Sequence, residues 1–169
     1  MVNQQSLVII KPDGLVKSLT GNIITALSET KLKIVGAKIV KVGKELAEKH
    51  YEDLKIKKPQ LFDSIVKYLM GGYHTDRVLA LVYEGENAIE KIREVCGSTN
   101  PEEAHPISIR GRYGRINSKT GVFENVIHTS DSEAAAEREI KLWFKPLELV
   151  DIVFKTKRVN ISREELEWD

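Results

Sequence analysis

The chain has 169 residues and a mass of 19.1 kDa, the size of a typical domain, and its 41% hydrophobic content is too high for a disordered chain. Lys and Arg number 26 against 25 Asp and Glu, so the net charge of +1 gives no electrostatic argument for a nucleic acid or an anionic membrane as partner. The longest apolar run is far shorter than the roughly 20 residues that span a bilayer. One cysteine excludes an internal disulfide, and no leader-like pattern opens the chain, so we expect a single cytoplasmic domain over residues 1–169.

The first part of the chain alternates between strand and helix patterns. A β-branched run at residues 6–10 predicts a buried strand that stops at the turn residues 11–14. Apolar residues at helical spacing predict a helix over residues 20–31, and β-branched residues then predict a second strand over 33–42. Residues 44–54 are charged and predict a helix.

Pro59 suits the first turn of a further helix. The apolar residues assigned to its inner stripe are Leu61, Ile65, Tyr68 and Leu69. Residues 71–76 have loop composition, 77–83 predict a central strand, and 87–95 predict a helix.

Residues 96–121 lose both periodicities and predict a long loop, which is usually functional or disordered. A strand is expected over 122–127, and Ser130 with Glu133 has the spacing of a capping box that opens a helix through Trp143. This order of elements predicts an α+β fold, a ferredoxin-like sandwich of split βαβ units in which helices pack on an antiparallel sheet.

Side chains suited to phosphate gather in and beside the long loop. They are Arg93, Thr99, Arg110, Arg112 and Arg115. Arginine can hold phosphate oxygens with two parallel hydrogen bonds, but a solvated surface loop would show the same composition. Neither of the two familiar glycine-rich phosphate loops occurs, so any nucleotide is bound without them.

Lys11 and His128 are the strongest single candidates for functional residues. Lys11 ends a buried strand, where its ammonium could meet a phosphate or simply extend to solvent. His128 follows a strand and precedes a capped helix, which suits a nucleophile but also a histidine that satisfies a helix end. Glu139 and Ser130 are close enough in sequence to orient its ring.

Six blocks of sequence favour the functional interpretation of these residues over the structural one. Together, and in this order, they resemble the nucleoside diphosphate kinase family from about residue 6 to 151. The blocks are Lys11-Pro12-Asp13-Gly14, His50-Tyr51, Gly97-Ser98-Thr99-Asn100-Pro101, Ile109-Arg110-Gly111, Asn125-Val126-Ile127-His128-Thr129-Ser130-Asp131-Ser132 and Glu139-Ile140-Lys141-Leu142-Trp143-Phe144. The N-x-x-H-x-S-D-S stretch is the most specific of them.

The resemblance implies a ping-pong phosphotransferase that carries the terminal phosphoryl group of a nucleoside triphosphate on His128 and passes it to a nucleoside diphosphate. By the same resemblance, Glu139 and Ser130 position His128, and Tyr51 lies beside it. The residues implied to hold the nucleotide are Lys11, Arg93, Thr99, Arg110 and Asn125, with Leu61 or Phe62 against the base.

The resemblance further implies that Mg2+ arrives with the nucleotide, so no protein metal ligand is assigned. The implied substrates are ATP, GTP and their deoxy forms, and the implied assembly is a homo-oligomer, a hexamer or a tetramer built from dimers. Neither a membrane nor a nucleic acid is expected as a partner.

Several positions depart from the family pattern. Leu61 occupies the place of the usual base-stacking phenylalanine, with Phe62 beside it, and Thr129 follows the histidine where the family has Gly or Ala. Arg112 replaces an acidic residue, and the loops at 71–76 and 112–124 are longer than usual. We expect the second loop to form a polar hairpin, with Gly114 and Gly121 at its ends in positive φ, that modifies assembly or covers the rim of the cleft.

Two other hypotheses compete with the active kinase. A catalytically weak relative could act as a nucleotide-binding or protein-interaction module, although such a module has no need of His128. A ferredoxin-like RNA-binding domain would be expected to carry basic bias and aromatic-rich strands, which this sequence lacks.

Overall fold

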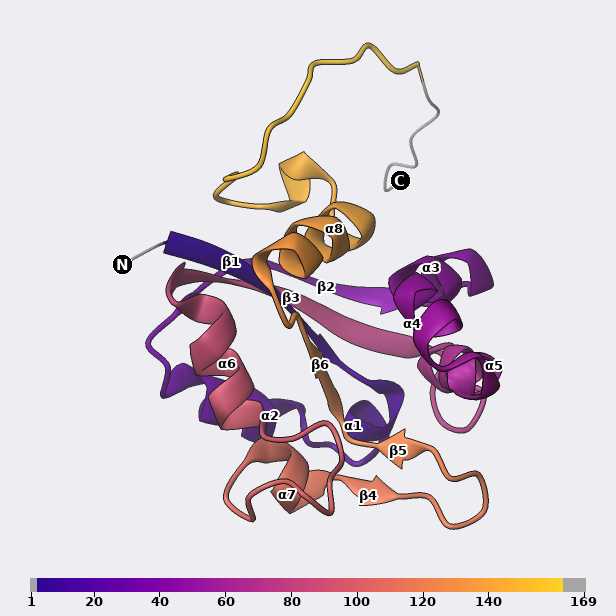
Figure 1. Ribbon diagram of the computed structural model, residues 1–169. Coiled ribbons are helices and arrows are strands. Elements are labelled where there is room, and N and C mark those ends of the chain that lie inside the picture. Colours follow the sequence, from indigo (N-terminus) through magenta and orange to yellow (C-terminus); the bar gives the residue numbers. More distant parts are fainter. Residues whose placement is uncertain (1–2, 163–169) are drawn as a thin grey trace, which may run out of the picture.

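The computed structural model describes residues 3–162, and its centre is an antiparallel sheet of four strands in the order β2-β3-β1-β6 (Figure 1). The strands are β1 (Asn3–Ile10), β2 (Lys33–Lys41), β3 (Arg77–Glu86) and β6 (Ile127–Thr129). Strands β1 and β2 run parallel with β3 between them, and β3 and β6 run parallel with β1 between them. These are two interlocked split βαβ units, which confirms the predicted ferredoxin-like fold class.

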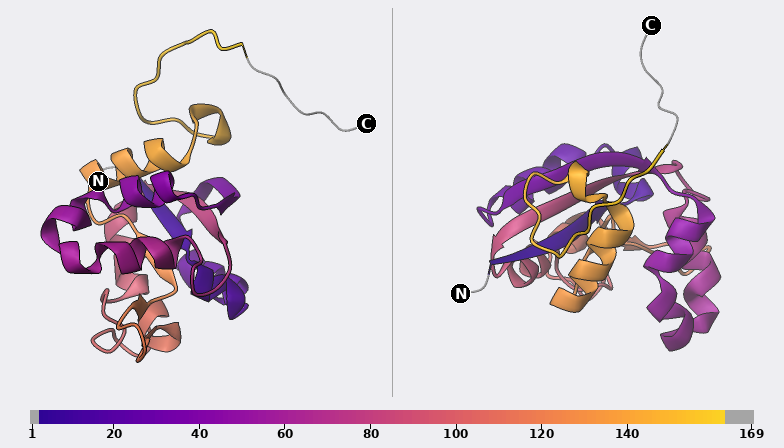
Figure 2. Two further views of the ribbon diagram at one scale, coloured as in Figure 1. Left: turned by 90° about the vertical axis from the view of Figure 1, so that its right-hand side faces the viewer. Right: turned by 90° about the horizontal axis from the view of Figure 1, so that it is seen from above.

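Helices cover both faces of this sheet. They are α1 (Pro12–Val16), α2 (Thr20–Ser28), α3 (Lys44–His50), α4 (Glu52–Lys57), α5 (Pro59–Leu69), α6 (Ala88–Cys96), α7 (Ile109–Tyr113) and α8 (Glu133–Trp143), followed by the 3-10 turn η1 (Pro146–Glu148). One hydrophobic core lies under α2, α6 and α7, and the other lies under α3, α5 and α8. Figure 2 shows helices on the two sides of the sheet. Among residues 3–162, no helix is both long enough and apolar enough to cross a membrane.

Strand β1 is apolar without interruption because both of its faces are covered. Leu7 and Ile9 pack into the core beneath α8, whereas Val8 and Ile10 pack into the core beneath α2 and α6. All four side chains are fully buried, and each such burial contributes about 1.5–3 kcal/mol to folding. The strand therefore provides a rigid base for residues at its carboxyl end.

Two helix predictions need correction. Residues 44–54 form α3 and α4 rather than one helix, because the backbone leaves helical geometry at Tyr51 (φ −103°, ψ 20°). The inner stripe of α5 is confirmed at Tyr68 and Leu69, which are buried, but it is wrong by one residue in the first two turns, where Phe62 and Val66 are buried and Leu61 is 41% exposed. Leu61 and Ile65 therefore face a cleft and not the core.

The long loop contains more order than its composition suggests. It carries α7, and the strand β4 (Arg115–Ile116) pairs with β5 (Phe123–Glu124) in the expected hairpin. Of the two glycines predicted in positive φ, Gly121 adopts it (φ +69°), while Gly114 is extended.

The strand predicted over residues 122–127 is broken. Asn125 and Val126 separate β5 from β6, and Val126 takes a φ of +58°, which is rare for a β-branched residue. The following helix, α8, is capped by Ser132, whose side chain accepts a hydrogen bond from the Ala135 N–H. Ser130, predicted as the cap, is instead buried beneath that helix.

Candidate active site

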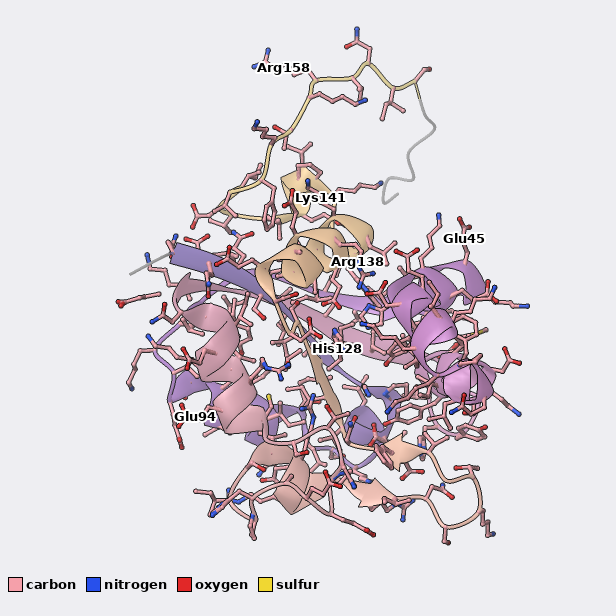
Figure 3. The ribbon with its side chains drawn as sticks, viewed as in Figure 1. Glu45, Glu94, His128, Arg138, Lys141 and Arg158 are labelled. Carbon is pink, nitrogen blue, oxygen red and sulfur yellow. The ribbon has the colours of Figure 1, made fainter. Side chains whose placement is uncertain are left out.

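His128 is placed by strand pairing between β6 and β1. It lies directly opposite Ile9, so its side chain shares the face of the sheet on which α8 packs. Figure 3 shows His128 in the middle of the molecule, between α6 and the α3–α4 region, with Arg138 of α8 nearby. The ring is only partly exposed, and it lines the central cleft.

Glu139 reaches His128 because it stands in the buried stripe of α8. It shares this stripe with Ala136, Ile140 and Trp143, at helical spacing. Its Oε2 lies 3.0 Å from His128 Nε2 and accepts a hydrogen bond of 2.7 Å from Ser130 Oγ. Ser130 Oγ also accepts from the Leu7 N–H at 3.1 Å, which ties this network to β1.

The charge of Glu139 determines which nitrogen of His128 can react. Burial raises the pKa of the Glu139 carboxyl, but His128, Ser130 and Arg138 together outweigh burial and leave this pKa below its ordinary value. An ionised carboxylate only accepts hydrogen bonds, so Nε2 of His128 carries the hydrogen that faces it. In the neutral ring, the free lone pair is then on Nδ1, and this is the nitrogen that is free to act as a nucleophile.

A second histidine, His50, packs against the His128 ring. The His50 ring meets His128 edge to face, with 4.3 Å between the ring centroids, and Trp143 Nε1–H donates to His50 Nδ1 at 3.1 Å. Burial first, and then the neighbouring His128, hold the pKa of His50 well below its usual value, so His50 is neutral. A neutral ring orients His128 without adding a second positive charge.

Three ligand-type side chains, His50, His128 and Glu139, have atoms within 4.8 Å of one another. Because the Trp143 indole occupies Nδ1 of His50, Nε2 of that ring carries its hydrogen and has no lone pair for a metal ion. Glu139 is already engaged by Ser130 and His128. This cluster is therefore built to orient the nucleophile.

Lys11 extends from the end of β1 into the same cleft. Its Nζ donates to Asn125 Oδ1 at 2.8 Å, and the Asn125 amide donates to the Thr99 carbonyl oxygen at 2.8 Å. Burial, with a smaller effect of Arg110, lowers the pKa of Lys11 to about 8, although Asp13 acts in the opposite direction. The ammonium is thus charged at neutral pH in a place that disfavours charge.

Arg110 is a second buried cation, only 7% exposed. Two of its nitrogens donate to the carbonyl oxygens of Gly97 (2.7 Å) and Ile127 (3.1 Å), while its Nε has no partner. Within residues 3–162, no carboxylate forms a salt bridge with Arg110 or Lys11. Buried charges are normally paired, so two of them without an anion form a prepared anion site.

The break at Val126 is held by Asp13, a fully buried carboxylate. One of its oxygens accepts from the Tyr68 hydroxyl and the other from the Val126 N–H at 3.1 Å. The Val126 carbonyl in turn accepts from the Lys11 N–H at 2.9 Å. These bonds stabilise the strained backbone between Asn125 and His128 and so set the positions of both side chains.

The cleft has a volume of about 350 Å³ and two chemically different ends. At one end lie the nucleophile and the polar residues Lys11, Tyr51, Arg93, Thr99, Arg110 and Asn125. The apolar lining, here called the apolar end, comes from α5 and the hairpin: Leu61, Ile65, Val122 and Phe123. Of these, Phe123 also borders a neighbouring hollow that Arg93, Thr99 and Arg110 line. The structure thus brings together every predicted site residue except Phe62, which packs into the core.

Tyr51 stands near the nucleophile, with 6.5 Å between its ring centroid and that of His128. Burial raises the pKa of this phenol, so its hydroxyl remains a donor at neutral pH. Arg93 is exposed on α6 and reaches the cleft from outside. Thr99 is exposed near the start of the α6–α7 loop.

The sequence reasoning assigned no role to His50, Asp13 or Glu124. His50 and Asp13 stand inside the blocks that carry the family resemblance, so those blocks contained a usable signal. Glu124 is 1% exposed and binds Arg115 and Asn117, and no local pattern distinguishes it from a surface glutamate.

Comparison with known proteins identifies the family to which this chain is similar. A family model described as nucleoside diphosphate kinase matches residues 4–149. Nucleoside diphosphate kinases of Pyrococcus furiosus and Staphylococcus epidermidis are 43% and 40% identical over 148 residues, which is 88% of this chain and 87% and 92% of those relatives.

Two solved structures are similar along most of the chain. A transition-state mimic of nucleoside-diphosphate kinase from Borrelia burgdorferi, with bound vanadate and ADP, has a TM-score of 0.80 and 36% identity, and the match covers 94% of each chain. The nucleoside diphosphate kinase of Aquifex aeolicus has a TM-score of 0.76 and 32% identity, and the match covers 88% of this chain and 100% of that one.

Proposed function

Because the chain belongs to the nucleoside diphosphate kinase family, we propose that it performs this phosphoryl transfer through His128. In the first half-reaction, His128 Nδ1 attacks the terminal phosphorus of a nucleoside triphosphate. The new N–P bond forms as the bond to the bridging oxygen breaks, and that oxygen leaves with the nucleoside diphosphate. A second diphosphate then attacks the phosphohistidine by the reverse route, which restores the free ring.

The pair of buried cations without an anion carries this proposal. Lys11 and Arg110 lie at the same end of the cleft as His128, and both are nearly inaccessible to water. Phosphoryl transfer requires mainly positioning and charge stabilisation, and fixed donors in a low-dielectric site supply both. A phosphate chain bound here neutralises charges that the folded protein leaves unpaired.

Further residues complete the phosphate end. Tyr51, Thr99 and Arg93 line the cleft, and we expect them to donate to the phosphates. Asn125 and Lys11 are hydrogen-bonded to each other in the cleft, and we expect them to meet the sugar hydroxyl. Asp131 also lines the cleft and is exposed. Mg2+ is commonly held by one or two carboxylates together with substrate phosphates, so this end of the cleft suits an ion that arrives with the nucleotide and neutralises phosphate charge.

Substrate range, assembly and location belong to the same proposal. Leu61, at the apolar end of the cleft, can contact a base but cannot form base-specific hydrogen bonds with it. We therefore expect kcat/KM for ATP, GTP and their deoxy forms to agree within about tenfold. Homo-oligomeric assembly is supported by the edge strand β2, where Ile34 and Ile39 are 46% and 61% exposed. A cytoplasmic location is supported by the lone cysteine, Cys96, which is free and buried.

Intact-mass measurement after mixing with ATP and magnesium tests the proposal. One added phosphoryl group, labile in acid and stable in base, is expected on the parent chain and absent from His128→Ala. His105→Ala is the matched control because His105 is exposed and lies outside the cleft, so it should be labelled like the parent. A parent that binds ADP but is never labelled would favour a nucleotide-binding module instead.

A further inference from the structure

The apolar end of the cleft contains one aromatic face that is available to a ligand. Three aromatic side chains of described residues line the cleft, Tyr51, Tyr68 and Phe123. Tyr51 stands beside the nucleophile, and Tyr68 is 1% exposed with its hydroxyl bound to Asp13. Phe123, on β5, is 37% exposed, and it borders both this cleft and a neighbouring hollow beneath the α6–α7 loop.

Phe123 is held in place by the residue that follows it. Glu124 is buried and accepts hydrogen bonds from Arg115 Nε (2.6 Å) and Asn117 Nδ2 (2.7 Å), which are both on the longer loop. Oε1 of Glu124, the oxygen that accepts from Asn117, also lies 3.2 Å from His74 Nε2, in the longer loop at residues 71–76. The two insertions are therefore fastened to one another through a single carboxylate.

This anchor controls the direction of the Phe123 ring. Burial raises the pKa of Glu124, but Arg115, Asn117 and His74 together lower it further than burial raises it, so the anchor is ionised at neutral pH. Successive residues of a strand point to opposite sides, so the inward Glu124 turns Phe123 outward, toward the cleft. The ring reaches the cleft from the hairpin, whereas Leu61 reaches it from α5.

We propose that Phe123 is the stacking residue for the nucleotide base, with Leu61 as the aliphatic wall on the α5 side. The inference rests on the proposed function, since it assigns the apolar end of the same cleft. The longer loop then compensates for the absence of an aromatic residue at position 61. A stacking ring is sequence-tolerant because every base presents a π-face, so Phe123 contributes affinity for all nucleotides rather than selection among them.

Calorimetric binding of ADP and of inorganic pyrophosphate to the unphosphorylated chain separates base contacts from phosphate contacts. Phe123→Ala should raise the Kd for ADP about tenfold, equivalent to about 1.4 kcal/mol, and leave the Kd for pyrophosphate unchanged. The unchanged pyrophosphate value also shows that the variant is folded. Tyr73→Ala is the matched control, because Tyr73 is a partly exposed aromatic that does not line the cleft, and it should alter neither constant.

Phe123→Trp gives a second, spectroscopic readout. It should bind ADP within about threefold of the parent, and the fluorescence of the added indole should be quenched by ADP and not by pyrophosphate. An unchanged Kd for ADP in Phe123→Ala, or an equal loss for both ligands, would overturn the inference. A parent that binds ADP through Phe123 yet is never labelled by ATP would overturn the proposed function and leave this inference standing.

Discussion

The buried ammonium of Lys11 predicts an unusual alkaline limit to activity. Because burial lowers its pKa to about 8, the phosphate site loses a positive charge well below the usual range of lysine. Protonated Lys11 falls from about nine-tenths of the molecules at pH 7 to about one-tenth at pH 9. We therefore expect kcat/KM for the nucleotide to decrease about tenfold over this range, and Lys11→Arg to remove the decrease because arginine stays charged.

The same titration has the opposite effect on stability. In the unfolded chain Lys11 titrates near 10.5, so burial of its charged form costs about 3 kcal/mol at 1.36 kcal/mol per pKa unit. This cost is present in full below pH 8 and disappears as the pH rises toward 10.5, because the folded protein holds the lysine neutral there. Raising the pH thus weakens catalysis while it relieves a destabilising charge.

Lys11→Met isolates this contribution. The variant loses the hydrogen bond to Asn125, and this loss changes its free energy of unfolding by the same amount at every pH. The titration of Lys11 changes the free energy of unfolding of the parent alone, and only where the pH approaches or exceeds 8. Urea unfolding should show the difference between parent and Lys11→Met changing by about 1 kcal/mol from pH 8 to pH 9, in favour of the parent. A pH-independent difference, or a kcat/KM that stays level through pH 9, would refute the assignment of this titration to Lys11.

Three further predictions concern the site and its loops. Arg110→Ala should lower kcat/KM on the order of 10²-fold or more, whereas exposed Arg112→Ala should change it less than about twofold in the same steady-state assay; equal losses would show that Arg110 is not the phosphate-binding arginine. Glu139→Gln should slow labelling of His128 in rapid-quench experiments by about 10–100-fold, because the amide no longer enforces the tautomer with a free Nδ1, and a parent-like rate would contradict that role. Gly71→Ala should reduce the free energy of unfolding by more than about 1 kcal/mol, since Gly71 has a φ of +80° and a Cβ would lie 1.9 Å from the Thr75 carbonyl oxygen, while Gly43→Ala meets nothing and should be near neutral in urea unfolding.

The sequence was most informative where local pattern and function coincide. The apolar run of β1 and the helical spacing of α2 and α6 predict these elements because burial against a sheet imposes those periodicities. His128 and Glu139 were predictable as a pair, since a strand end and the helix that follows it must lie close together. The order of the elements was sufficient for the ferredoxin-like fold class.

The rotation of α5 shows where periodicity is insufficient. Leu61, Phe62, Ile65 and Val66 offer two apolar stripes one residue apart, and sequence spacing cannot tell which one faces the sheet. The structure buries Phe62 and Val66 in the core and leaves Leu61 and Ile65 to the cleft. Only packing against the other helices of that face decides between the two.

Long-range contacts decided the chemistry of the cleft. The positive φ of Val126 depends on Asp13, and the anchor of Phe123 depends on a carboxylate that meets His74 fifty positions away. Lys11 and Arg110 are ordinary basic residues in the sequence, and they become an anion site because the fold buries both while no carboxylate within residues 3–162 forms a salt bridge with either. Residue type is a local property, whereas burial and the absence of a partner are set by segments that meet only in the folded chain.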